Sequence, residues 1–374
     1  MNQFINNKNS NYKIKNIIIG QYRYLCIYIS FILTCFLPIF GWFNEELTSP
    51  LRYVITFITI ISFNWSKWNK FKILIILFLF LSIIVRRLLV IWVIISLSYQ
   101  ILELKIPLKK IGKIGFLTYL IIILFLIELN LFAIIKNQPV IYEKFNRILY
   151  DLGTGNTNRT GLLFLSFFLY AYFVFNNKNL FNYIIFSLIL SFIIFYITGC
   201  RTMFFSIIIL NLFLIFEKFK LINNWQRFIY GLLPLIFLVG SFYLTYAVED
   251  NSEINSTMSG RLGYIQRFTL ESSVKDLLIG TVNESDSPLD SSYLALVVKG
   301  GLILVLFFSL GFLGSSIKFW NVNKKFLPVV TAILCSGITE STFSNLNSTS
   351  LLIWLYIIQF YSSKKIIYFY QLKN

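Results

Sequence analysis

Residues 195–206, FYITGCRTMFFS, separate two apolar runs that are each close to a membrane thickness in length. A run of about 20 apolar residues is long enough to cross the hydrocarbon core of a bilayer as an α-helix. Arg201 lies in the turn of about three residues between the two runs. The sequence therefore predicts a tight helical hairpin whose turn holds a permanent cation at one face of a membrane.

Similar apolar runs recur along the whole chain of 374 residues, of which 57% are hydrophobic and 13% are charged. Soluble globular chains carry about 25% charged residues. We therefore expect an all-α, polytopic integral membrane protein with a single membrane domain, 1–374, and about 12 transmembrane helices. The expected helices cover residues 22–40, 51–64, 73–86, 88–102, 114–135, 161–175, 180–198, 202–216, 228–247, 293–313, 326–340 and 351–363.

Lysine positions predict the orientation of these helices, since lysine and arginine accumulate in cytoplasmic loops. If the N-terminal tail, 1–21, is cytoplasmic, then 19 of the 23 lysines fall on the cytoplasmic side. The C-terminal tail, 364–374, is then cytoplasmic too. Two larger loops, 136–160 and 248–292, lie on the outer face. The net charge of +17 follows from this topology, and we expect no nucleic-acid partner.

Arginine is distributed differently from lysine. Eight of the ten arginines fall on the outer side or at its membrane edge, against the usual trend. The planar guanidinium group offers five donors in a geometry that matches phosphate. The outer face is therefore expected to bind phosphate through some of these side chains, which are Arg52, Arg86, Arg87, Arg147, Arg159, Arg201, Arg261 and Arg267.

The larger outer loop carries eight of the sixteen acidic residues. Within it, SGRLGYIQRF (259–268) and SSVKDLLIG (272–280) are typical of short amphipathic helices. Ser259 and Ser273 are the candidate N-caps. Asp276 follows Ser273 by three residues, as in a capping box, and Gly280 suits a helix end. Such helices would lie along the membrane surface and shape a site there.

Four arginines are candidates for binding a diphosphate. Arg201 either clamps this group or contacts the phosphates of ordinary lipids. Arg261 follows Ser-Gly at an expected helix start, where backbone N–H groups also attract anions. Arg267 either binds the diphosphate together with Arg261 or lies on a solvated helix face, where it pairs with acidic residues of the loop. Arg159 flanks the glycine-rich loop DLGTGNTNRTG (151–161), which resembles a flexible ligand-contacting segment.

Three carboxylates are candidate bases or paired groups. Asp290 lies just outside a helix start and is either a base or a helix N-cap. Glu340 lies at the outer end of the next helix. Glu128 lies within a span, where charge is costly, so we expect it to be functional or paired. The chain has no histidine, and its four cysteines form no CxxC pair, so no metal site or cofactor is expected.

Four segments between residues 155 and 360 resemble, in order, the O-antigen and capsular repeat-unit polymerases (Wzy-type) of the O-antigen ligase/polymerase superfamily. They are TGCRTMFFSIII (198–209), SGRLGYIQR (259–267), LLIGTVN with DSSYLALVVKGGLI (277–283 and 290–303), and GITESTFSNLNSTSLLIW (337–354). The first is similar to a small-residue–Arg–Thr segment that opens a helix in that superfamily. The last is similar to its closing helix pair.

The resemblance implies a metal-independent glycosyltransferase of a bacterial inner membrane whose active site faces the periplasm. Its donor and acceptor would be oligosaccharide repeats linked to undecaprenyl diphosphate. Arg201 and Arg261 would contact the diphosphate. Asp290 occupies the position at which ligases of this superfamily carry histidine, which argues against a ligase delivering to lipid A core. Glu340 is the other candidate base.

Two alternatives stay open at this point. One is a ligase-like transferase of the same architecture. The other is a flippase or transporter of lipid-linked oligosaccharides, in which charges should follow a central path and two related halves are common. Here the halves are unlike and polar groups gather in two outer loops, which favours an enzyme. Membrane lipids are expected partners, and a separate protein is expected to control chain length.

Overall fold

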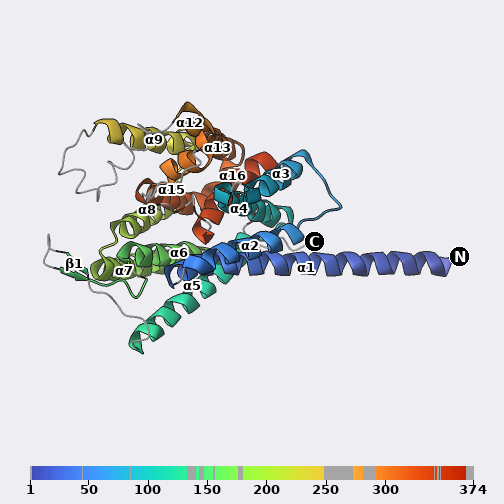
Figure 1. The fold of residues 1–374 in the computed structure, drawn as a ribbon, viewed down its shortest axis with the longest axis horizontal. Coiled ribbons are helices and arrows are strands. Elements are labelled where there is room, and N and C mark those ends of the chain that lie inside the picture. The colour runs from blue at the N-terminus through green and yellow to red at the C-terminus, as the bar shows by residue number, and fades with distance from the viewer. Residues whose placement is uncertain are drawn as a thin grey trace.

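The computed structural model describes the backbone of residues 2–43, 45–84, 86–132, 140–142, 147–154, 156–175, 180–247, 273–280, 291–340, 342, 345 and 347–367. The longer helices of this part are α1 Asn2–Phe43, α2 Glu45–Ile61, α3 Lys70–Ile84, α4 Arg86–Glu103, α5 Leu108–Leu131, α6 Thr157–Phe175, α7 Leu180–Thr198, α8 Arg201–Lys218, α9 Gln226–Ala247, α13 Ser292–Lys318, α15 Leu327–Thr339 and α16 Ser348–Ser362 (Figure 1). Short helical elements are α12 Val274–Ile279, α14 Trp320–Asn323 and η2 Lys324–Phe326.

All twelve segments expected to be helical coincide with a helix of the structure. Among the described residues, five helices are long and apolar enough to cross a membrane. They contain Ile19–Phe40, Leu108–Leu131, Thr157–Phe175, Leu180–Thr198 and Ser292–Lys318. The helical class is therefore confirmed and a membrane-embedded protein is supported, while the number of about 12 spans stays a prediction.

Two features of the fold differ from the expectation. Helix α1 begins at Asn2, so the expected tail continues the first span as one helix. Extending an existing helix costs little, because each added residue contributes a hydrogen bond. The loop 136–160 also contains a short antiparallel hairpin, in which β1 (Val140–Tyr142) pairs with β2 (Arg147–Leu149).

Helix α16 occupies the centre of the molecule (Figure 1). Its residues from Leu351 to Ile358 are buried on every side. An α-helix that is apolar around its whole circumference must be surrounded, since it has no polar face for water. Helices α4 and α13 pack on α16, where Phe308 meets Trp354 edge to face with ring centroids 5.3 Å apart.

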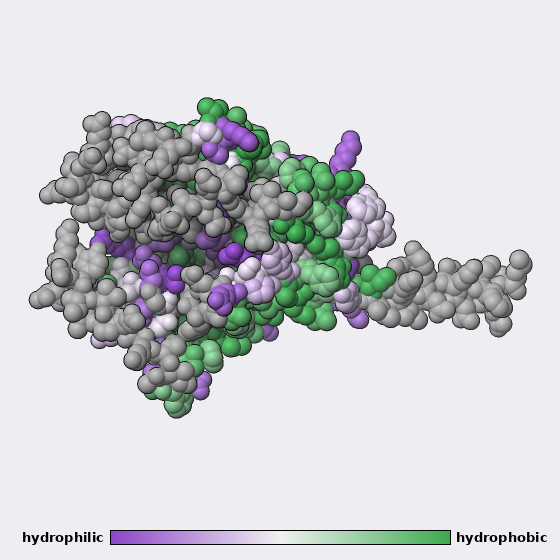
Figure 2. Space-filling view, viewed as in Figure 1, coloured by the Kyte–Doolittle hydropathy of each residue, from purple (hydrophilic) through white to green (hydrophobic). Residues whose placement is uncertain are grey.

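Large apolar side chains cover the outside of the peripheral helices. Ile121 of α5, Phe192 of α7 and Val239 of α9 are each about 60% exposed. Figure 2 shows hydrophobic residues over α5 and around α2 and α4, and hydrophilic ones gathered towards the ends of α6 and α15. Apolar surface of this extent is stable against lipid rather than water.

One end of the helix bundle, which we call the Glu103 end, is tied together by charged and polar side chains. Arg23 donates to Glu103 Oε2 at 2.5 Å and to the carbonyl oxygen of Ser62 at 2.8 Å. Lys364 lies 3.8 Å from the other Glu103 oxygen. Burial lowers the pKa of Lys364, and the Glu103 carboxylate opposes that shift. This cluster joins α1, the residue after α2, α4 and the segment after α16.

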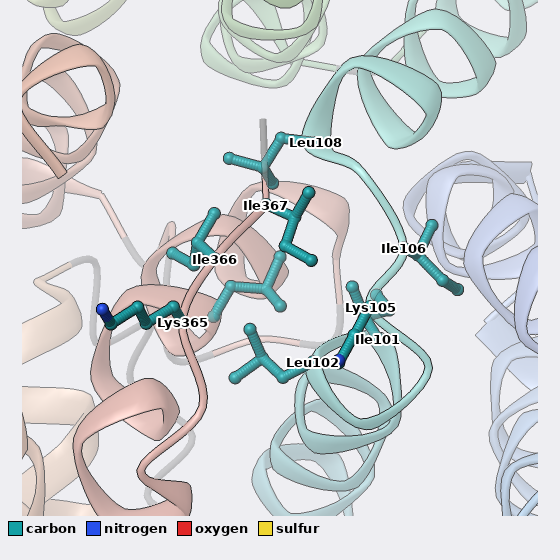
Figure 3. Close-up of a pocket in the computed structure, with 9 residues that line it drawn as sticks. Ile101, Leu102, Lys105, Ile106, Leu108, Lys365, Ile366 and Ile367 are labelled. Atoms are coloured by element: carbon teal, nitrogen blue, oxygen red, sulfur yellow. The ribbon is translucent and has the colours of Figure 1, made fainter. Parts of the chain in front are cut away.

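A shallow hollow at the same end lies where α4, the start of α5 and the C-terminal segment meet (Figure 3). Leu108 N donates to Ile367 O at 2.7 Å beside it. It is lined by isoleucine and leucine side chains together with Lys105 and Lys365, and it does not admit a water molecule. The hollow is therefore a packing feature and not a candidate site.

The Glu103 carboxylate should be a major source of stability. Glu103→Gln removes the negative partner of two cations that lie largely out of water, which costs about 3–5 kcal/mol for a buried pair. The measurement is thermal unfolding of the purified protein in detergent. Glu217→Gln, the same change on a half-exposed carboxylate near the end of α8, is the control. Equal unfolding temperatures for the two variants would contradict the prediction.

Candidate functional site

The opposite end of the bundle, which we call the Glu340 end, collects several residues predicted to act on substrate. Helices α6, α8, α13 and α16 begin there, and α7 and α15 end there. Its described residues are 150–154, 156–159, 198–202, 291–292, 339–340, 342, 345 and 347–350. Arg159, Arg201 and Glu340 all belong to it, although they are far apart in the sequence.

Arg201 is the first residue of α8, and its side chain is exposed. Only Gly199 and Cys200 separate it from α7, so the connection is one residue tighter than expected. Gly199 has a φ of +68°, which glycine adopts without steric cost, and its N–H closes α7 by donating to Phe195 O at 2.8 Å. This turn fixes Arg201 at the tip of the hairpin.

Thr202, the next residue, connects α8 to α15. Its hydroxyl lies 2.8 Å from that of Thr339, the last residue of α15. Glu340 follows directly and is only 6% exposed. Because α8 packs against α15 and their ends are bonded here, the chain positions of Arg201 and Glu340 lie near each other.

Arg159 lies in the first turn of α6 with its side chain exposed, and its Nη1 is 3.5 Å from Thr154 O. The start of α6 packs on the turn before α8. A Cβ at Gly161 would clash with Sγ of Cys200, so the two helices touch at this glycine. Arg159 and Arg201 therefore sit on the first turns of two helices in direct contact.

The glycine-rich loop before Arg159 is an ordered turn in its described residues. Asp151 is buried, and its Oδ1 accepts from Gly153 N at 2.9 Å. Thr154 and Thr160 join hydroxyls at 2.9 Å, and Tyr150 N donates to Ile197 O at 2.9 Å. The loop is thus anchored to the end of α7 near Arg201.

Glu340 begins the polar connection between α15 and α16, of which the structure describes residues 340, 342, 345 and 347. Its backbone oxygen accepts from Ser292 Oγ at 2.7 Å, and Ser350 Oγ donates to Thr342 O at 2.8 Å. Hydroxyl groups of α5 and α6 reach the first turn of α16. Their contacts are Tyr119–Ser348 at 2.5 Å, Tyr170–Ser348 O at 2.6 Å and Ser166–Thr349 at 2.7 Å. Four helices therefore hold this connection in place.

Three of the predicted site residues, Arg261, Arg267 and Asp290, lie outside the described residues. The same holds for the helix expected over 259–268. The N-cap of α13 is Ser291, one residue after Asp290. Ser291 Oγ is 3.4 Å from Gly337 O, so α13 begins within the Glu340 end.

The second amphipathic helix of the large loop is confirmed as α12. Ser273 is its N-cap and forms a capping box with Asp276, and Gly280 is its C-cap at a φ of 90°. Glu128, expected to be functional or paired, has an exposed side chain in the last turn of α5. The helix ends at Leu131, so the carboxylate lies one turn from the helix end.

Lys299 was not singled out from the sequence. It is half-buried, and its Nζ donates to Oδ1 of Asn345 at 2.8 Å. The sequence feature that could have identified Lys299 is its position within the apolar run YLALVVKGGLILV (293–305), directly before two glycines. An ionisable residue within such a run is a functional candidate by its cost alone.

Comparison of the chain with protein-family models, with curated proteins and with solved structures finds no significant match.

The contact between α6 and Cys200 should be required for the geometry of the arginines. In Gly161→Ala the added methyl group overlaps Cys200 Sγ, and overpacking of this kind costs about 1–3 kcal/mol. Gly240→Ala is the matched control, because a Cβ there meets no atom within 4 Å. Thermal unfolding in detergent should show a loss for the first variant and none for the second. Equal unfolding temperatures would contradict the assigned contact.

Proposed function

We propose that this chain is a glycosyltransferase that polymerises oligosaccharide repeats linked to undecaprenyl diphosphate, forming O-antigen or capsular polysaccharide at the periplasmic face of the inner membrane. The observation that carries the proposal is the meeting of Arg159, Arg201 and Glu340 at one end of a membrane-embedded bundle. The motif resemblance supports it independently. Guanidinium groups suit a diphosphate, and a carboxylate suits removal of a proton from a sugar hydroxyl.

The reaction joins two lipid-linked glycans. An acceptor hydroxyl attacks the anomeric carbon of the donor glycan, a new C–O bond forms, and the bond to the diphosphate breaks. Arg201 and Arg159 stabilise the negative charge that develops on the leaving diphosphate. Glu340 accepts the proton of the attacking hydroxyl, with Asp290 as the other candidate. The resemblance assigns Arg261 to the diphosphate, and Arg267 is a further candidate for the same group.

The position of these groups suits a substrate that enters from the bilayer. The arginine side chains are exposed at the ends of helices whose flanks are apolar. A lipid-linked diphosphate holds its phosphates at the level of the headgroups and its chain among the acyl tails. It can therefore reach Arg201 without leaving the membrane, and ordinary membrane lipids are its competitors.

Deletion of the gene in its own host tests the proposal through the length of the surface glycan on gels. Loss of a polymerase should reduce the glycan to a single capped repeat. Lipid-linked repeats trapped on the cytoplasmic side, with no surface glycan, would overturn the proposal and favour a flippase.

Complementation of that deletion tests the role of Arg201. Arg201→Ala and Arg201→Lys should both abolish chain growth at a normal protein level, because an ammonium group cannot reproduce the bidentate contact. Removing one preorganised donor typically costs 10²–10³ in rate. Arg227→Lys, near the start of α9 at the Glu103 end, is the control and should support full-length glycan. Full-length glycan with Arg201→Lys would contradict the bidentate role.

A further inference from the structure

The connection between α2 and α3, residues 62–69, lies at the edge of the bundle at its Glu103 end (Figure 1). Two large side chains of this connection face outwards, since Trp65 is 44% exposed and Trp68 is 54% exposed. The side chains of Lys67 and Lys70, beside them in the sequence, are exposed as well. Tryptophan is highly buried on average in folded proteins, so two exposed indoles next to two cations indicate a surface that contacts something outside the chain.

A third lysine, Lys72, is buried and holds the connection in its shape. Its Nζ donates to the carbonyl oxygens of Asn64 and Lys67, the second at 2.8 Å. The same Nζ lies 5.4 Å from the ring centroid of Trp68, within the range of a cation–π contact. An ammonium group has three donors, and these contacts direct them into the protein. Lys72 is therefore a positioning residue for the connection.

Two asparagines add to this order. Asn69 Oδ1 accepts from Lys72 N at 2.8 Å, and Asn69 Nδ2 donates to the hydroxyl of Tyr99, on α4, at 2.8 Å. Asn64 Oδ1 accepts from Ser66 N at 3.2 Å and from Ser66 Oγ at 2.6 Å. The two indoles meet edge to face, with ring centroids 5.7 Å apart. The connection is thus bonded to itself and to α4, and its exposed rings have defined positions.

The indoles lie next to the lipid-facing side of α3. Large apolar side chains are exposed along one side of this helix at helical spacing, and they are Ile73, Leu74, Leu77, Phe80 and Leu81. Such a surface is stable against lipid rather than water. Helix α3 begins at Lys70, two residues after Trp68, so the tryptophans lie where this apolar side ends. Tryptophan is enriched at that boundary between acyl chains and headgroups, and lysine extends its ammonium group from there towards the phosphates.

The charge of this region indicates which lipid it binds. Residues 61–84 contain three lysines and no acidic residue. Of the three, Lys67 and Lys70 have exposed side chains. A headgroup with a net negative charge is attracted to such a segment, whereas a zwitterionic headgroup also brings a cation. Charge complementarity therefore favours an anionic phospholipid over a neutral one.

We infer that the connection between α2 and α3 is a binding site for the headgroups of anionic phospholipids. Lys67 and Lys70 bind the phosphate, and Trp65 and Trp68 lie against the glycerol and the upper part of the acyl chains. Lys72 acts through the backbone of the connection and does not contact the lipid. The site is at the opposite end of the bundle from Glu340 and does not depend on the proposed function.

Fluorescence quenching by brominated lipids tests this inference. The full-length protein is reconstituted in phosphatidylcholine vesicles with increasing fractions of brominated phosphatidylglycerol or brominated phosphatidylcholine. The signal of Trp65 and Trp68 is the difference between the unsubstituted protein and the double variant Trp65→Phe, Trp68→Phe. Brominated phosphatidylglycerol should quench this signal at about one tenth of the fraction that brominated phosphatidylcholine requires, since each lysine near an anionic surface contributes severalfold in affinity. The double variant Lys67→Gln, Lys70→Gln should respond equally to both lipids.

The matched control is the double variant Lys105→Gln, Lys365→Gln, which removes two exposed lysines from the same end of the bundle. It should keep the preference for phosphatidylglycerol. An equal loss of preference in both lysine variants would assign the effect to the general charge of this end and overturn the inference. Equal quenching of the unsubstituted protein by the two lipids would also overturn it. So would the absence of quenching by either lipid, because protein rather than lipid would then cover the tryptophans.

Discussion

The rest of the structure depends on the hydrogen bonds that hold the connection between α15 and α16. Within a bilayer no water satisfies polar groups, so each must find a partner in the protein. Ser350 closes the turn on Thr342, Ser292 reaches it from α13, and Tyr119 and Tyr170 reach it from α5 and α6. This polar connection, at the Glu340 end of an apolar bundle, thereby joins helices α5, α6, α13 and α16 and positions Glu340.

The two ends of the bundle hold their charged side chains differently. At the Glu103 end, Arg23 and Lys364 surround one carboxylate and tie the first helix to the last segment. At the Glu340 end, Arg159 and Arg201 are instead exposed on the first turns of their helices. Buried pairing suits a structural role, since an unpaired charge there would be costly. Exposed guanidinium groups suit an external anionic ligand, which is the basis of the proposed function.

The helices were largely predictable from the sequence, and the site only in part. Apolar runs identify helices because their length and composition leave few alternatives, and α12 was predictable from its Ser273–Asp276 capping box. The hairpin of β1 and β2 was missed, since strands this short are defined by their pairing. The break in helix α13 at Gly301 was not predicted, because it occurs where α12 packs against α13. The proximity of the chain positions of Arg201 and Glu340 depends on the packing of α8 against α15, including the Thr202–Thr339 contact, which no spacing in the sequence encodes.

The central claim is that this end of the bundle transfers a glycan from a lipid diphosphate to another lipid-linked glycan. The most direct measurement incubates the purified protein with lipid-linked repeats extracted from the deletion strain and analyses the products by mass spectrometry. The account predicts glycans of two, three and more repeats, with one free polyprenyl diphosphate released for each new linkage. Unextended repeats and no released polyprenyl diphosphate, from protein that is folded and binds farnesyl diphosphate, would contradict it.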